Sequence, residues 1–74
     1  MSGIKTMFPQ KTYKHRRCLD MGLSIHSVQD SMDNLDCIEV VASVINLNNG
    51  IEYEITTFDI KKEDLCYWTL VEHS

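Results

Sequence analysis

The sequence predicts a small α+β domain, with an extended basic N-terminal arm, one short amphipathic helix and then a three-stranded antiparallel β-meander. Three observations predict this class. Apolar residues recur at helical spacing over residues 24–35, strand-like alternation begins at Cys37, and an Asn-Gly dipeptide divides the alternating region. With 74 residues the chain has room for one domain and a small core.

The first 17 residues predict an arm that is extended or partly disordered. They carry five basic side chains and no acidic one, and Gly3 and Pro9 interrupt any regular period. Residues 18–60, by contrast, carry eight acidic side chains and no basic one. The net charge of −4 is therefore the sum of a basic arm and an acidic body, and we expect residues 18–74 to form the single folded domain.

The helix is predicted at residues 24–35, where Ser24 or Ser27 is a suitable N-cap. The apolar residues of this segment share one stripe at 100° per residue: Ile25, Val28, Met32 and Leu35. His26, Asp30 and Asp33 lie on the opposite side, where a solvated acidic face explains them without a bound cation. The preceding segment, residues 18–23, fits either a short strand or a loop, because Gly22 interrupts a helix.

The most distinct element is a hairpin of strands over residues 37–47 and 51–58. Asn49-Gly50 favours a two-residue type I′ turn, which pairs Val44 with Ile55. The same register pairs Asn46 with Tyr53 and Ala42 with Thr57. Residues 59–64 fit a loop or one helical turn, and residues 65–72 predict the third strand of the meander.

Strand alternation leaves apolar side chains on both faces of this sheet, which is more than one short helix covers. We expect the second face to bind a partner. Its apolar members are Val41, Ile45, Leu47 and Phe58, with Glu52 and Glu54 as a charged rim. The alternative is that residues 1–23 fold back over this face through Phe8, Tyr13, Leu19, Met21 and Leu23.

The predicted function is that of a non-enzymatic protein-binding module: an inhibitor, an adaptor or a small regulatory subunit. The partner is another protein, a second copy of the chain in a homodimer, or both. A chain of this size is typical of accessory regulators encoded by a virus, a phage or another mobile element. Catalysis, a bound metal and a cofactor are not expected, because the motifs C-x-x-C and G-x-S-x-G and glycine-rich phosphate loops do not occur in the sequence.

The alternative function is nucleic-acid binding through the arm. Lys11, Lys14, Arg16 and Arg17 are suited to phosphate contacts, and Tyr13 among them is an aromatic ring for stacking. The acidic body opposes this, because its carboxylates repel a phosphate backbone.

The expected location is the cytoplasm. Three cysteines, at widely spaced positions 18, 37 and 66, fit reduced thiols better than a disulfide framework. The sequence also lacks the apolar run of a secretory signal or a membrane span, so no membrane partner is expected.

Overall fold

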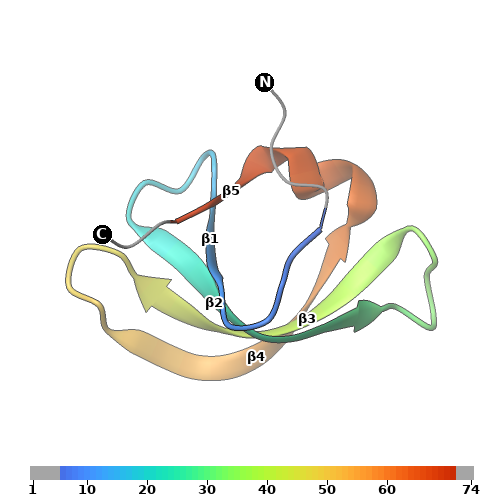
Figure 1. The fold of residues 1–74 in the computed structure, drawn as a ribbon, viewed down its shortest axis with the longest axis horizontal. Coiled ribbons are helices and arrows are strands. Elements are labelled where there is room, and N and C mark those ends of the chain that lie inside the picture. Colours follow the sequence, from blue (N-terminus) through green and yellow to red (C-terminus); the bar gives the residue numbers. More distant parts are fainter. Residues whose placement is uncertain (1–5, 72–74) are drawn as a thin grey trace.

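The computed structural model describes residues 6–71 and shows one five-stranded antiparallel sheet with a 3-10 helix (Figure 1). The strands are β1 (Thr12–His15), β2 (Met21–Asp30), β3 (Cys37–Asn46), β4 (Glu52–Lys61) and β5 (Trp68–Leu70), and the helix η1 (Lys62–Tyr67) precedes β5. Their order across the sheet is β4-β3-β2-β1-β5. The predicted α+β class is wrong, because residues 6–71 form two more strands than expected and no helix longer than η1.

The segment predicted as a helix over residues 24–35 is the greater part of β2 and the turn that follows it. The register between β2 and β3 shifts between Ile25 and Ser27, so that His26 is the extra residue of a β-bulge. A bulge places residues three apart on the same side of a strand. Ile25 and Val28 both pack against the core for this reason, and their spacing imitates that of a helix.

Local hydrogen bonds hold the turn between β2 and β3. The Asn34 N–H donates to Ser31 Oγ at 3.3 Å, and the Asp36 N–H donates to Asn34 Oδ1 at 3.0 Å. Short polar side chains that bond the backbone in this way compete with helix formation. Met32 and Leu35, the other members of the predicted apolar stripe, are exposed in this turn, Met32 to 94%.

The predicted hairpin is present as β3 and β4, but its loop has four residues instead of two. The Asn46 N–H donates to the Ile51 carbonyl at 2.8 Å and closes the loop of residues 47–50. Asn46 Oδ1 accepts the N–H of Asn48 at 2.9 Å inside it. Only Gly50 in this loop has a positive φ, of 76°, whereas a type I′ turn needs two such residues.

The longer loop shifts the predicted pairing by two residues, so that Ile45 lies opposite Glu52, and a bulge in β4 reduces the shift to one residue from Ile55 onward. Ile55 lies opposite Ser43 instead of Val44, and Phe58 lies opposite Val40. A slip of one residue moves every side chain of a strand to the other face. Phe58 therefore lies on the inner side of the sheet, and Ile55 lies on the outer side.

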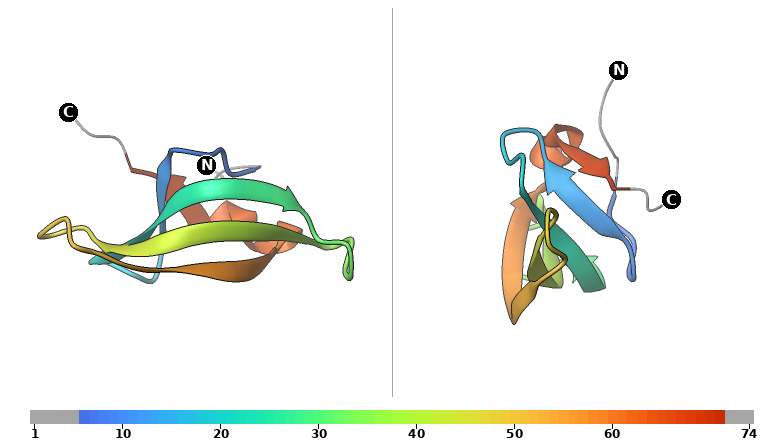
Figure 2. Two further views of the ribbon diagram at one scale, coloured as in Figure 1. Left: turned by 90° about the horizontal axis from the view of Figure 1, so that it is seen from below. Right: turned by 90° about the vertical axis from the view of Figure 1, so that its left-hand side faces the viewer.

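The core occupies the concave side of the strongly curved sheet, and η1 lies across the open side of the curve (Figures 1 and 2). Ile25 and Val40, from the middle strands, are the largest fully buried side chains. The buried apolar cluster consists of Met7, Tyr13, Leu23, Ile25, Ile38, Val40, Ala42, Ile60 and Leu65. Because Leu65 belongs to η1, this short helix anchors the chain between β4 and β5.

Within the described residues the third predicted strand, over residues 65–72, is correct only for β5, and residue 72 lies outside them. Residues 62–67 form η1 instead. The helical turn that was one expectation for residues 59–64 is therefore present only from residue 62. β5 pairs with β1 and not with β4: Leu70 lies opposite Tyr13, and Trp68 lies opposite His15. The last described strand thus lies beside the first.

The predicted basic arm supplies β1, which lies between β2 and β5. Met7 and Tyr13 of this segment are buried in the core. The Tyr13 hydroxyl accepts the Phe8 N–H at 2.9 Å. Lys5 and the other residues of 1–5 lie outside the described residues. Residues 6–23 add to the sheet itself and do not form a layer over its outer face.

Candidate functional site

The four apolar residues predicted to bind a partner do not all lie on the outer face of the sheet. Val41 and Ile45 are half-buried on the outer face of β3, between small and polar neighbours on β2 and β4. Leu47, in the β3–β4 loop, lies against the backbone of β2 at Gly22. Phe58 faces inward and packs against the core, so it is misassigned as a member of the second face.

Glu52 and Glu54, which were predicted to form a charged rim, are both exposed on β4. Around them the structure reveals large apolar side chains that the predicted site omits. Ile51, Tyr53 and Ile55 are each half-exposed, Ile55 to 55%. The predicted register places Tyr53 and Ile55 on the face that the helix was expected to cover, which is why sequence reasoning missed them.

One edge of β4 is open. Among the described strands only β3 pairs with it, so β4 ends the sheet. The Lys62 N–H donates to the Asp36 carbonyl at 2.7 Å, so Lys62 and Asp36 form a hydrogen-bonded pair. Hydrogen-bonded and non-hydrogen-bonded pairs alternate along an antiparallel ladder. From this alternation, Ile55, Thr57 and Asp59 direct their backbone N–H and C=O groups away from β3. We call this stretch, residues 55–59, the β4 edge.

The basic residues of the alternative site lie along β1 and the turn after it. Lys11 is exposed just before β1, Lys14 is half-buried within it, and Arg16 and Arg17 are exposed in the turn. Tyr13 cannot stack on a base as predicted, because it is only 2% exposed. The aromatic ring near the arginines comes from the other end of the chain.

Two aromatic residues from the end of η1 and the start of β5 lie beside the β1 turn. The His15 and Tyr67 rings have centroids 5.9 Å apart, and the His15 and Trp68 rings pack edge to face at 5.2 Å. The Arg16 N–H donates to the Tyr67 carbonyl at 2.8 Å, and the Arg17 N–H donates to His15 Nδ1 at 3.1 Å. We call these five residues the aromatic–basic cluster.

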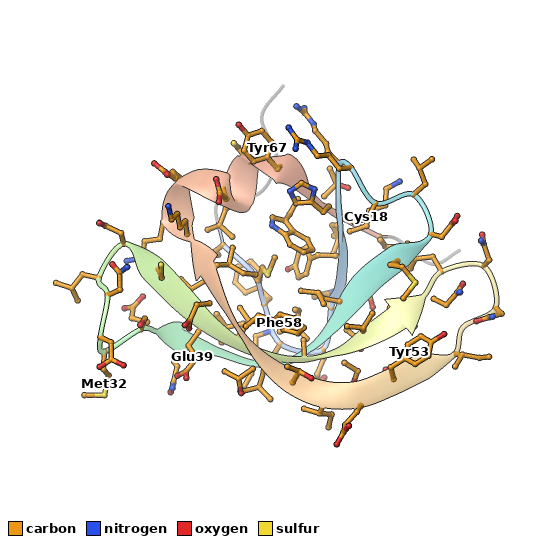
Figure 3. All side chains as sticks on the ribbon, turned by 180° about the vertical axis from the view of Figure 1, so that it is seen from behind. Cys18, Met32, Glu39, Tyr53, Phe58 and Tyr67 are labelled. Carbon is orange, nitrogen blue, oxygen red and sulfur yellow. The ribbon has the colours of Figure 1, made fainter. Side chains whose placement is uncertain are left out.

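A hollow of about 230 Å³ opens within the aromatic–basic cluster. Its lining consists of His15, Arg17, Asp64 and Tyr67. Tyr67 is 44% exposed, so its ring is accessible. Figure 3 shows Tyr67 across the molecule from Tyr53 of β4. The cluster and the β4 edge also belong to different parts of the sheet, because β3 and β2 separate β4 from β1.

Two other hollows have different linings. One of about 370 Å³ is lined by polar and charged residues of both signs: Asn34, Asp36, Lys61, Lys62 and Glu63. Beside it, Lys62 Nζ lies 3.7 Å from Asp30 Oδ1, and both side chains are solvent-exposed. The other, of about 180 Å³, lies on the inner side of Trp68 and is lined almost wholly by apolar atoms.

The histidine and the two carboxylates predicted on one helix face do not come together in the structure. His26 lies at the bulge of β2, where its Nε2 is 2.8 Å from Ser43 Oγ, and Asp30 and Asp33 lie at the end of β2 and in the turn. Within residues 6–71, no three His, Cys, Asp or Glu side chains are placed to hold a metal ion. The described part of the chain also contains no helix with the length and apolar character needed to cross a membrane.

Comparisons with protein-family models, with curated proteins and with solved structures found no match to this chain.

Proposed function

We propose that the protein is a non-enzymatic protein-binding module, acting as an inhibitor, an adaptor or a small regulatory subunit, and that its partner adds a strand to the β4 edge. The observation that carries this proposal is the row of backbone groups at Ile55, Thr57 and Asp59 that point away from β3. An open edge of this kind is a template for pairing with an extended segment of another chain.

The side chains around the β4 edge support the same proposal. Natural sheets protect an edge strand with charged side chains, especially lysine, with proline, with a bulge or with a very short strand, and the bulge of β4 lies before the β4 edge. β4 has ten residues, and neither proline nor lysine occurs between Glu52 and Ile60. Ile51, Tyr53 and Ile55 expose apolar surface next to the open backbone groups. The apolar side chains supply contact area, while the backbone supplies the hydrogen bonds.

Charge indicates which kind of strand the edge prefers. Glu52, Glu54 and Asp59 are exposed on β4, and Glu39 lies opposite Asp59 on β3. Lysine or arginine at alternate positions of a partner strand would complement these carboxylates. A second copy of β4 would instead bring the same carboxylates together. We therefore commit to another protein with a cationic extended segment, and we place the complex in the cytoplasm, since Cys18, Cys37 and Cys66 are free thiols.

A proline substitution tests the edge directly. Thr57→Pro removes an N–H that points to the open edge and leaves the groups that pair with β3 intact. Thr57→Val keeps the N–H and is the matched control. The wild-type protein and each variant would be used as bait in selections from a displayed library of extended peptides. We expect enrichment of peptides with alternating Lys or Arg on wild type and Thr57→Val, and its loss on Thr57→Pro.

Equal enrichment on Thr57→Pro, or no enrichment on any bait, would show that the β4 edge is not the docking site. Light scattering at micromolar concentration shows whether a second copy of the chain occupies the β4 edge. A dimer that becomes a monomer in Thr57→Pro would mean that a second copy occupies the edge, which contradicts the proposed cationic partner. Circular dichroism and thermal unfolding of the two variants show whether each retains the native fold.

A further inference from the structure

We propose that the aromatic–basic cluster binds single-stranded nucleic acid, with one base stacked on Tyr67 and the neighbouring phosphates held by Arg16 and Arg17. Proteins that bind single strands combine an exposed aromatic platform with cations that follow the backbone. Both components are fixed here by the fold. The Arg16 N–H bond to the Tyr67 carbonyl joins the cationic turn to the aromatic residue, although the two lie 51 positions apart in the chain.

The hollow beside Tyr67 has the size and lining for a single base. Its volume of about 230 Å³ is below the roughly 300–1,000 Å³ of sites for drug-sized ligands, so one planar ring system fits better than a larger cofactor. His15 forms one wall, and Arg17 stands at the hollow where a phosphate attached to that base would lie. His15 is itself held by Trp68 and by the Arg17 N–H, so this wall is preorganised.

Asp64 gives the hollow a preference among bases. A carboxylate repels phosphate, but it accepts a hydrogen bond from an exocyclic amino group such as N4 of cytosine. Thymine and uracil offer no such amino group. Because Asp64 lines the hollow together with Tyr67, the base that stacks on the ring is within the reach of this carboxylate. We therefore infer that cytosine is bound in preference to thymine or uracil.

The acidic character of the rest of the protein does not prevent this contact. The carboxylates of β4 belong to a strand that β3 and β2 separate from β1 in the sheet. The molecule measures 35 × 31 × 19 Å, whereas charges are screened over about 8 Å at physiological ionic strength. Asp64 of η1 lines the hollow itself, and Asp20 lies in the same turn as the two arginines. The net charge thus lowers the affinity for nucleic acid less than the sequence suggests.

Fluorescence of Trp68 is a direct probe, because it is the only tryptophan and its ring packs on His15. The full chain would be titrated with single-stranded oligonucleotides of about 12 cytosines or thymines, as DNA and as RNA. We expect saturable binding with a preference for cytosine. Tyr67→Ala should weaken binding by about 5- to 150-fold, the effect of losing one stacked base, while Tyr67→Phe retains most of the affinity.

Charge and base preference have separate controls. The double variant Arg16→Ala, Arg17→Ala should reduce the slope of log K against log salt concentration by about 1.4. The control double variant Lys61→Ala, Lys62→Ala removes the same charge elsewhere and should leave this slope nearly unchanged. Asp64→Ala should abolish the preference for cytosine. Each variant is first compared with wild type by circular dichroism, and Tyr67 is exposed enough for its replacement to leave the core intact.

The proposal is wrong if Tyr67→Ala binds as tightly as wild type, or if no oligonucleotide binds. Heparin provides the remaining comparison, because it carries negative charge without bases. Should heparin bind as tightly as the oligonucleotides and equally well to Tyr67→Ala, the cluster is a general anion surface that suits an acidic protein, and the stacking role of Tyr67 is refuted.

Discussion

Replacement of Gly22 by alanine tests how closely β1 and β2 must approach. A Cβ added to Gly22 would lie 2.8 Å from the Tyr13 carbonyl oxygen and 3.3 Å from Leu47 Cδ2. The leucine end can rotate away, but the carbonyl belongs to the backbone of β1 and cannot. β1 must therefore move outward from β2. The ladder between these two strands consists only of the Thr12 and Tyr13 pairs.

Two opposing effects set the magnitude. Alanine restricts the unfolded chain more than glycine does, which by itself stabilises a protein by about 0.4–1 kcal/mol. Overpacking against a neighbour that cannot relax costs about 1–3 kcal/mol. The clash is expected to dominate, so Gly22→Ala should lower the free energy of unfolding by about 1–2 kcal/mol. For a domain of this length, that corresponds to a fall in Tm of about 5–15 °C.

Thermal unfolding followed by far-UV circular dichroism and by Trp68 fluorescence measures this change. Ser24→Ala is the matched control, because Ser24 lies two residues further along β2 on the same face and also pairs with β1. We expect its Tm to stay within a few degrees of wild type. A Gly22→Ala variant with a Tm equal to or above that of wild type would refute the close approach of β1 and β2.

Two further predictions concern the core and the thiols. Ile25→Ala should lower the free energy of unfolding by about 2–5 kcal/mol in urea denaturation, because Ile25 is fully buried, whereas Met32→Ala should change it little; similar losses for both would place the core elsewhere. A thiol reagent such as DTNB should react rapidly with Cys18 and Cys66, which are exposed, and with Cys37 only on unfolding; rapid reaction of three thiols in the native protein would contradict the burial of Cys37.

The hairpin was predictable from the sequence because its signals are local. Alternation on both sides of Asn49-Gly50 identifies the ends of β3 and the start of β4 to within one residue, but it ends β4 three residues too early. The register was not predictable from the dipeptide alone. Hydrogen bonds from Asn46 and a bulge in β4 near Tyr53 decide the loop length and the pairing, and neither has a distinct sequence signal.

The helix prediction failed because a bulge and a helix produce the same short pattern. Ile25 and Val28 are three residues apart and share a face in either structure. Composition could have argued against the helix, since this segment contains three serines, two aspartates and an asparagine, which favour caps and turns over helix interiors. β1 was missed for a different reason: it has four residues, and it is stabilised by neighbours distant in sequence.

The two proposed surfaces were predictable to different degrees. Exposed carboxylates on β4 and the arginines after β1 follow from charge placement in the sequence. The pairing of His15 with Trp68 does not, because it depends on β5 returning to β1. The aromatic partner of the arginines is for this reason Tyr67 and not the nearby Tyr13, whose ring the fold requires in the core.

Because β5 pairs with β1, the aromatic–basic cluster lies at the two shortest strands of the sheet. β1 and β5 have four and three residues, whereas β2, β3 and β4 have ten each. Short strands at the end of a sheet open locally at a lower free energy than its centre. A ligand that bridges Arg16 and Tyr67 binds only the closed form, so binding and local closure become linked equilibria. Amide hydrogen exchange at β5 would then slow in proportion to occupancy, while exchange in the β2–β4 centre stays unchanged.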